Sequence, residues 1–194
     1  MKRLNNISIN NRGFTLVEVM MTLLIFGVVL GVVANVFFTT QGLYGRTTQR
    51  ADQQMNTRAG LSVMVAEIRR AGADPNNESI NALGSAHQDT VRVRTEMNDT
   101  AGLQTDEPSE DVLYFYDVDQ GTVFRDPGTG PQPMITNVTN FSLQFFDSNN
   151  NVIGPTPLTL TMRDQVRSIG INVTTETPGG GEMVVSTRVG LRNR

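Results

Sequence analysis

The sequence predicts an α+β fold in which one long N-terminal helix packs on an antiparallel β-sheet. Two observations lead to this prediction. No proline occurs before position 75, so nothing interrupts a helix in the first part of the chain. Beyond that position, short segments alternate apolar and polar residues and are separated by stretches rich in glycine, proline, asparagine and aspartate.

The helix begins with an apolar stretch. Residues 14–38 carry one charged side chain, Glu18, and would form a helix about 37 Å long, which exceeds the roughly 30 Å of a bilayer core. We therefore expect residues 14–38 to cross a membrane. The basic residues before the span favour a cytoplasmic N-terminus (Lys2, Arg3 and Arg12). Arg46 and Arg50 lie just beyond its other end, so the charge bias does not decide the orientation alone.

The junction before this span reads Arg12-Gly13-Phe14-Thr15-Leu16-Val17-Glu18. A basic leader, a glycine, an aromatic residue and an acid in the first helical turn resemble the class III leader of type IV prepilins and type II secretion pseudopilins. An ordinary secretory signal is cut after its apolar region, whereas Gly13-Phe14 precedes the apolar region here. The resemblance implies that a prepilin peptidase cleaves after Gly13, removes residues 1–13 as a leader peptide and N-methylates Phe14.

Glu18 is an acid inside a predicted membrane helix and has two interpretations. Its carboxylate could extend to the nearby headgroups, because it lies one turn into the helix. The resemblance implies instead that Glu18 faces the α-amino group of a neighbouring subunit and fixes register during filament assembly. We favour the assembly role, because glycine, aromatic residue, acid and apolar span all match.

Residues 39–74 continue the helix as a stalk and a sheet-packing segment. Residues 39–58 contain few apolar side chains and should be poorly buried. The final turns place apolar residues at i, i+3, i+4 and i+7, which predicts one buried face (Leu61, Met64, Val65 and Ile68). Gly72 follows the last turn and should end the helix.

Residues 75–194 are expected to form a β-rich globular domain. Strands are predicted where apolar residues alternate or cluster (Val91–Thr95, Val112–Val118, and around Phe141–Phe145, Ile169–Val173 and Val185–Leu191). Loops are predicted over residues 96–111 and 126–133, and Pro178–Gly181 should connect the last two strands. The stretches Tyr44–Gly72 and Asn140–Asp147 and the closing strand resemble PilW-type minor pilins and the related J-type pseudopilins.

The composition lacks the residues on which the most common catalytic sites depend. There is no cysteine and one histidine, His87, in a polar stretch. Without the leader, which holds three of the 16 basic residues, 13 remain against 19 acidic residues, a net charge of −6. Such a charge gives no electrostatic reason to bind nucleic acid. We expect no catalytic residue and no cofactor.

Two acidic segments deserve comparison with known sites. Asp147 opens a D-x-N-x-N sequence with the oxygen spacing of a calcium loop. Val152 stands where such a loop needs glycine and Leu158 where it needs its closing acid, so we expect a turn and no metal. The carboxylate pairs Asp106-Glu107 and Glu110-Asp111 flank Pro108-Ser109 and are interpreted as a solvated loop.

The sequence therefore predicts a non-enzymatic subunit, a minor type IV pilin anchored in the bacterial inner membrane with its C-terminal domain in the periplasm. The resemblance implies other minor and major pilins, the prepilin peptidase and an inner-membrane assembly platform as partners. The alternatives are a J-type pseudopilin of a type II secretion tip complex and a membrane-anchored periplasmic binding module.

Overall fold

A computed structural model describes residues 13–74, 80–97, 107–177 and 180–191. The expected leader up to Arg12, the acidic segment around Asp106 and the turn residues Pro178 and Gly179 lie outside the described residues. The chain divides into two compact units, which end and begin at Thr47 and Thr48.

The helix α1 runs from Leu16 to Arg70 and crosses the division between the units. Gly72, with a φ of 77°, follows its last turn, in the left-handed conformation that glycine adopts most readily. The predicted long helix, uninterrupted by proline, is confirmed. Every residue of α1 before Thr48 is exposed.

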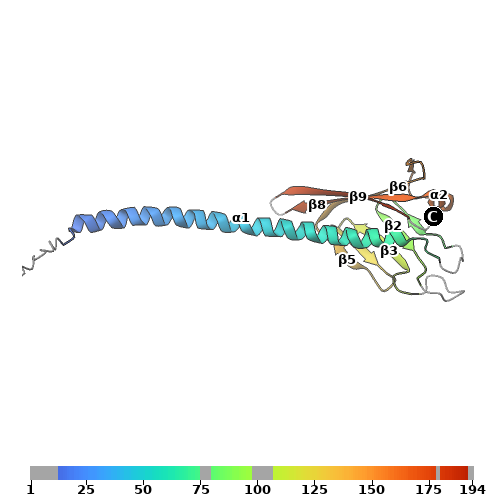
Figure 1. Ribbon diagram of the computed structural model, residues 1–194, viewed down its shortest axis with the longest axis horizontal. Coiled ribbons are helices and arrows are strands. Elements are labelled where there is room, and N and C mark those ends of the chain that lie inside the picture. Colours follow the sequence, from blue (N-terminus) through green and yellow to red (C-terminus); the bar gives the residue numbers. More distant parts are fainter. Residues whose placement is uncertain (1–12, 75–79, 98–106, 178–179, 192–194) are drawn as a thin grey trace, which may run out of the picture. The chain divides into compact units, whose positions relative to one another are not determined.

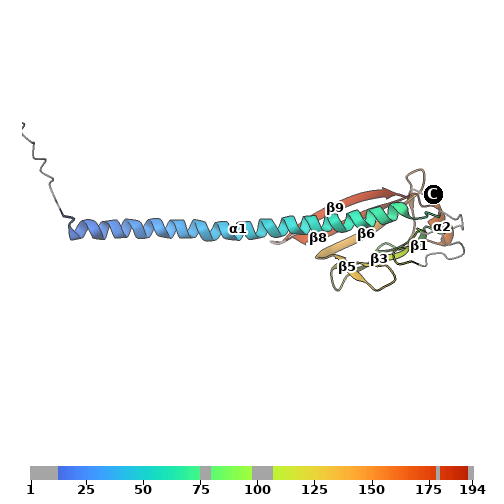
Figure 2. The ribbon, with the colours of Figure 1, turned by 60° about the horizontal axis from the view of Figure 1, so that its bottom comes forward.

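The second unit contains two antiparallel sheets rather than the single sheet that the sequence predicted (Figures 1 and 2). The five-stranded sheet has the order β1 (Leu83–Ala86), β2 (Thr90–Arg94), β3 (Asp111–Asp117), β4 (Thr122–Asp126) and β5 (Gln132–Ile135). The four-stranded sheet has the order β7 (Val152–Ile153), β6 (Val138–Phe146), β8 (Ser168–Thr177) and β9 (Gly181–Gly190). A short helix, α2 (Leu160–Gln165), precedes β8.

Backbone and side-chain hydrogen bonds join the two sheets through β6. The Leu143 N–H donates to the Gln88 carbonyl at 2.7 Å, and the Val138 N–H donates to the Gly121 carbonyl at 2.8 Å. The Tyr116 hydroxyl, from β3, donates to the Val138 carbonyl at 2.9 Å. The sheets therefore enclose one shared core rather than two separate ones.

The end of α1 packs on this core by the predicted face. Leu61, Met64 and Ile68 are buried, and Val65 is half-buried against them. Burial of such side chains stabilises a fold by about 1.5–3 kcal/mol each. Both views show residues 48–70 lying along the sheets (Figures 1 and 2).

Close approach between α1 and the five-stranded sheet depends on Gly60. A Cβ atom at this position would lie 2.6 Å from Ile135 Cγ1, nearer than two carbon atoms can pack. About two helical turns before Gly60, the Gln53 side chain donates to the Thr136 carbonyl at 2.7 Å and accepts from Asn137 Nδ2 at 3.2 Å. These polar contacts fix the helix where it first meets the sheets.

Candidate functional site at the start of the long helix

The expected processing site lies in an open segment ahead of α1. Apart from its chain neighbours, no atom of the described residues lies within 4 Å of where a Cβ of Gly13 would be, and Phe14 is 89% exposed. The peptide bond between them is outside any helix or strand. Nothing in the described residues shields this bond from a peptidase.

Thr15 and Glu18 form a reciprocal cap on the helix. The backbone N–H and the hydroxyl of Thr15 each donate to Glu18 Oε2 at 2.9 Å. The Glu18 N–H in turn approaches Thr15 Oγ1 at 3.3 Å. With Leu16 as the first helical residue, this is the capping box that a Thr-x-x-Glu spacing produces, and it satisfies two backbone donors that the helix cannot pair.

Sequence reasoning considered only headgroups and a neighbouring amine as partners of Glu18 and missed Thr15. The signal was present in the sequence, because a threonine or serine three residues before a glutamate, next to an apolar run, is the capping-box signature. The hydrogen bonds that Glu18 accepts end on Oε2 in the described part of the chain, so Oε1 is available to a second donor.

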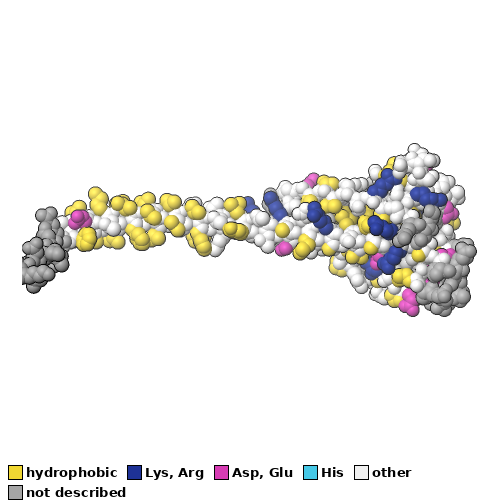
Figure 3. Space-filling model, in the orientation of Figure 1, with side chains coloured by type: hydrophobic (Ala, Val, Ile, Leu, Met, Phe, Trp, Pro, Cys, Tyr) yellow, Lys and Arg dark blue, Asp and Glu magenta, His cyan; other side chains and the backbone are white. Residues whose placement is uncertain are grey.

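The exposed part of α1 has the composition of a membrane span. It is long and apolar enough to cross a bilayer by length and composition. Apolar side chains cover it on the face shown in Figure 3. The hydroxyls of Thr22, Thr39 and Thr40 donate to carbonyls four residues earlier, at 2.7, 2.9 and 2.7 Å, so these polar groups find partners inside the helix.

The Asp147 segment is a closed turn between β6 and β7. Asp147 Oδ1 accepts from the Asn149 and Asn151 N–H groups, both at 2.8 Å, and Oδ2 accepts from Asn151 Nδ2 at 3.1 Å. The backbone hydrogen bond from Asn151 is the main reason why the pKa of Asp147 is lowered. The carboxylate oxygens that a cation would need are already engaged by the turn.

His87 and the acidic segment are not brought together. His87 is exposed in the turn between β1 and β2, with its N–H on the Thr90 carbonyl at 2.7 Å. Glu110 is buried and accepts from the Met97 and Glu107 N–H groups at 2.9 Å each, so it closes the base of its loop. In the described ranges no three His, Asp or Glu side chains form a group that could hold a metal ion.

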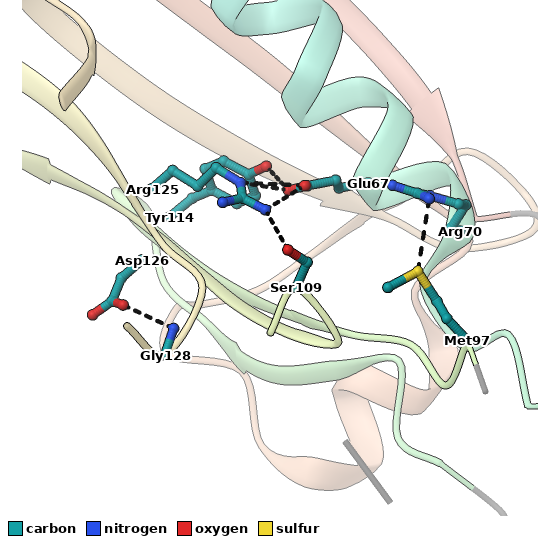
Figure 4. Close-up of polar contacts among 8 residues, drawn as sticks. All are labelled: Glu67, Arg70, Met97, Ser109, Tyr114, Arg125, Asp126 and Gly128. Atoms are coloured by element: carbon teal, nitrogen blue, oxygen red, sulfur yellow. Dashed lines mark hydrogen bonds and ion pairs between the residues drawn. The ribbon is translucent and has the colours of Figure 1, made fainter. Parts of the chain in front are cut away.

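One buried polar cluster links α1 to the five-stranded sheet (Figure 4). Glu67 accepts from the hydroxyl of fully buried Tyr114 and forms an ion pair with Arg125, at 2.7 Å between Nη2 and Oε1. Arg125 also donates to Ser109 Oγ at 3.1 Å. The opposite charges of Glu67 and Arg125 are paired with each other, and the Tyr114 hydroxyl has its acceptor, so the cluster acts as a structural connection.

The comparison with protein families identifies the N-terminal feature. Residues 9–34 match the family model of the prokaryotic N-terminal methylation motif. No curated protein matched the sequence. This match confirms the predicted type IV prepilin-like class III signal peptide, and it supports a protein of the type IV pilin-like or pseudopilin kind. The α+β arrangement, with a long N-terminal helix on antiparallel sheets, is consistent with a pilin-like fold.

Proposed function

We propose that this chain is a minor type IV pilin, a structural subunit that helps to prime or assemble a pilus after its leader is removed. The observation that carries the proposal is the methylation motif at residues 9–34, which leads into the exposed apolar first part of α1. Gly13 and Phe14 would be the peptidase site, and Phe14 the methylated N-terminus. Residues 14–38 would anchor the subunit in the inner membrane until assembly, with the β-rich unit in the periplasm.

Glu18 has a role in this proposal that follows from its geometry. Cleavage after Gly13 creates a positive α-amine on Phe14, four residues before Glu18 in the sequence. In a bundle of such helices the low-dielectric surroundings make an unpaired carboxylate costly, by several kcal/mol. The Oε1 atom, which the capping box leaves available, would accept the amine of a neighbouring subunit and so set the axial register.

A pseudopilin of a type II secretion system is the second candidate, because the same N-terminal motif serves both kinds of protein. The partners of both would be other pilin-type subunits, the prepilin peptidase and an inner-membrane assembly platform. Genes encoded beside this one, or the subunits recovered with it, would distinguish the two.

The decisive experiment is intact-mass analysis and N-terminal sequencing of the protein from membranes of its own host. We expect a chain that starts at methylated Phe14. A chain that starts at Met1, or that is cut after residue 38, would contradict the proposal and leave a plain membrane anchor or a secreted domain. A Gly13→Ala variant tests the peptidase directly, since it should keep its leader.

A further inference from the structure

The four-stranded sheet ends in a long open edge. Strand β9 (Gly181–Gly190) pairs with β8 on one side, and no described strand pairs with its other side. Edge strands present unpaired N–H and C=O groups to any extended segment that reaches them. The outer edge of β9 therefore offers an interaction surface made of backbone N–H donors and C=O acceptors.

The hydrogen-bond pattern shows which residues face outward. The Leu191 N–H donates to the Arg167 carbonyl at 2.9 Å, which continues the β8–β9 register by one pair and marks it as hydrogen-bonded. Because paired and unpaired positions alternate in an antiparallel ladder, odd-numbered residues of β9 point their backbone groups at β8. The even-numbered residues point theirs outward (Glu182, Val184, Ser186 and Arg188).

The other described sheet edges are protected and β9 is not. β1 has four residues and a register shift, β5 has four residues, a register shift and Pro133, and β7 has two residues. Short length, bulges and proline are the usual means of preventing edge-to-edge pairing. In contrast, β9 pairs with β8 over ten consecutive residues without a shift and contains no proline, and its two charged residues, Glu182 and Arg188, leave the stretch between them uncharged.

A groove beside this edge has room for the side chains of an added strand. It measures about 310 Å³ and lies between α1 and β9 (lined by Arg58, Leu61, Val65, Val185 and Thr187 among others). On β8 the residues of the helix-facing side are fully buried (Ile169, Ile171 and Val173), whereas Met183, Val185 and Thr187 of β9 are half-buried. The core is thus incompletely covered where the sheet stops.

We propose that the outer edge of β9 accepts an extended strand from a different prepilin-type subunit, with alternate apolar side chains that fill the groove beside α1. This inference rests on the proposed function for the kind of partner. The occupant must be an extended strand, because the even-numbered residues of β9 present alternating backbone donors and acceptors that only an extended backbone satisfies together. An added strand continues the sheet at the usual spacing of about 4.8 Å and completes the cover over Val185.

The geometry disfavours a second copy of this chain as the occupant. Its remaining described edges are too short or too irregular to match ten residues of β9. Antiparallel pairing of two β9 edges about a two-fold axis would run residues 48–70 of the two α1 helices in opposite directions. Subunits anchored in one membrane share one direction.

The experiment uses the full chain in its own host, where the absence of cysteine allows single-cysteine labelling. A thiol-reactive benzophenone is attached at Val184→Cys, on the β9 edge, and at Val152→Cys, on β7 at the other edge of the same sheet. The two valines are matched, with 65% and 64% of each exposed. Each labelled chain is irradiated in intact cells, and the crosslinked peptide is identified by mass spectrometry.

A proline substitution tests whether a backbone hydrogen bond is used. Ser186→Pro removes an outward N–H but no bond to β8, and Ser186→Ala keeps the N–H. We expect Val184→Cys to crosslink to one extended segment of another subunit that has a processed prepilin N-terminus. Ser186→Pro should reduce that adduct about tenfold, the loss expected for one well-formed hydrogen bond with its neighbours, and Ser186→Ala should retain it.

The opposing outcomes are equally definite. No adduct at Val184, an adduct equal to that from Val152, an adduct to lipid, or an adduct to β9 of a second copy would each overturn the proposal. Thermal unfolding of the Ser186 variants shows whether each is folded. If Ser186→Pro is unfolded, the adduct from Val184→Cys in the chain without the proline substitution still decides the proposal. The N-terminal mass from the same cells separates this proposal from the proposed function, because a processed chain without the adduct contradicts only the edge contact.

Discussion

Glu67 on α1 and Arg125 on β4 form an ion pair that is largely withdrawn from water, with 2.7 Å between Arg125 Nη2 and Glu67 Oε1. Their side chains are 11% and 16% exposed. Arg125 Nε approaches both carboxylate oxygens, at 3.2 and 3.1 Å, so the guanidinium faces the carboxylate with two of its nitrogens (Figure 4). The pair therefore joins the last turns of the long helix to the five-stranded sheet.

Removing one member of this pair should destabilise the fold strongly. Arg125→Ala leaves the Glu67 carboxylate buried without its cation, and we expect a loss of about 3 kcal/mol in the free energy of unfolding. The matched control is Arg92→Ala, because Arg92 and its partner Asp111 are 41% and 25% exposed and such pairs contribute about 1 kcal/mol or less. Denaturant unfolding of the full chain in detergent measures both.

A double-mutant cycle isolates the pair itself. Glu67→Ala with Arg125→Ala should cost clearly less than the sum of the two single losses, since neither charge is then left alone. A loss in the double variant equal to the sum of the two single losses would show that the two side chains act independently and that the ion pair contributes little.

Alkaline pH should destabilise the protein through Tyr114. Burial is the largest cause that raises the pKa of Tyr114 above its ordinary value of 10.0, and its hydrogen bond to Glu67 adds to the shift. The unfolded chain therefore releases this proton at lower pH than the folded chain. The resulting stability is complete below about pH 10 and falls as the pH rises further.

The test compares melting temperatures between pH 8 and pH 11. In Tyr114→Phe the alkaline decrease should become smaller, although the variant is less stable at pH 8 because Glu67 loses a donor. An unchanged alkaline decrease in Tyr114→Phe would show that another group causes it.

The sequence predicted those parts of the fold whose signal is local. The helix was readable from the absence of proline and the spacing of Leu61, Met64 and Ile68, which the structure buries. Strands β2, β3, β6, β8 and β9 were readable from alternation or apolar clustering. Strand β1, the sequence Leu83-Gly84-Ser85-Ala86, was not, because small residues give no strand signal.

The predicted loop over residues 126–133 was partly wrong, because β4 includes Asp126 and β5 begins at Gln132. Pro133 argued against a strand, but β5 lies at a sheet edge, where a missing N–H is tolerated. The division into two sheets depends on pairings between distant strands, which no local pattern encodes.

Among the candidate functional features, those formed by neighbouring residues were also predictable from the sequence, and those formed by distant residues were not. The methylation motif is contiguous, so its recognition needed only the sequence, and the capping box was equally readable from Thr15 and Glu18. The Glu67 cluster was not, because Tyr114 and Arg125 follow Glu67 by 47 and 58 residues. Only the folded register brings them together.

Substitution of Gly60 should show that packing outweighs helix propensity. Alanine stabilises a helix interior by about 1 kcal/mol relative to glycine, but a Cβ at residue 60 would press on Ile135 Cγ1 at 2.6 Å. Overpacking typically costs about 1–3 kcal/mol, so Gly60→Ala should lower the melting temperature. Gly45→Ala is the control, because a Cβ there meets nothing within 4 Å, and it should leave the melting temperature equal or higher. A rise for Gly60→Ala would mean that α1 moves away from β5 at little cost.

The two roles of Glu18, as helix cap and as acceptor of a neighbour's amine, predict different responses to substitution. Glutamine keeps the reciprocal hydrogen bond to the Thr15 N–H but carries no charge. Glu18→Gln should therefore be processed after Gly13, retain the helix start and fail to enter filaments. Thr15→Ala keeps the carboxylate, loses the hydroxyl that caps the helix at a cost of about 1 kcal/mol, and should still assemble. Leader removal is measured by intact mass, and assembly by the amount of the subunit in sheared filaments. Wild-type assembly of Glu18→Gln, with loss of assembly in Thr15→Ala, would reverse the assignment, because the cap and not the charge would then be what the filament requires.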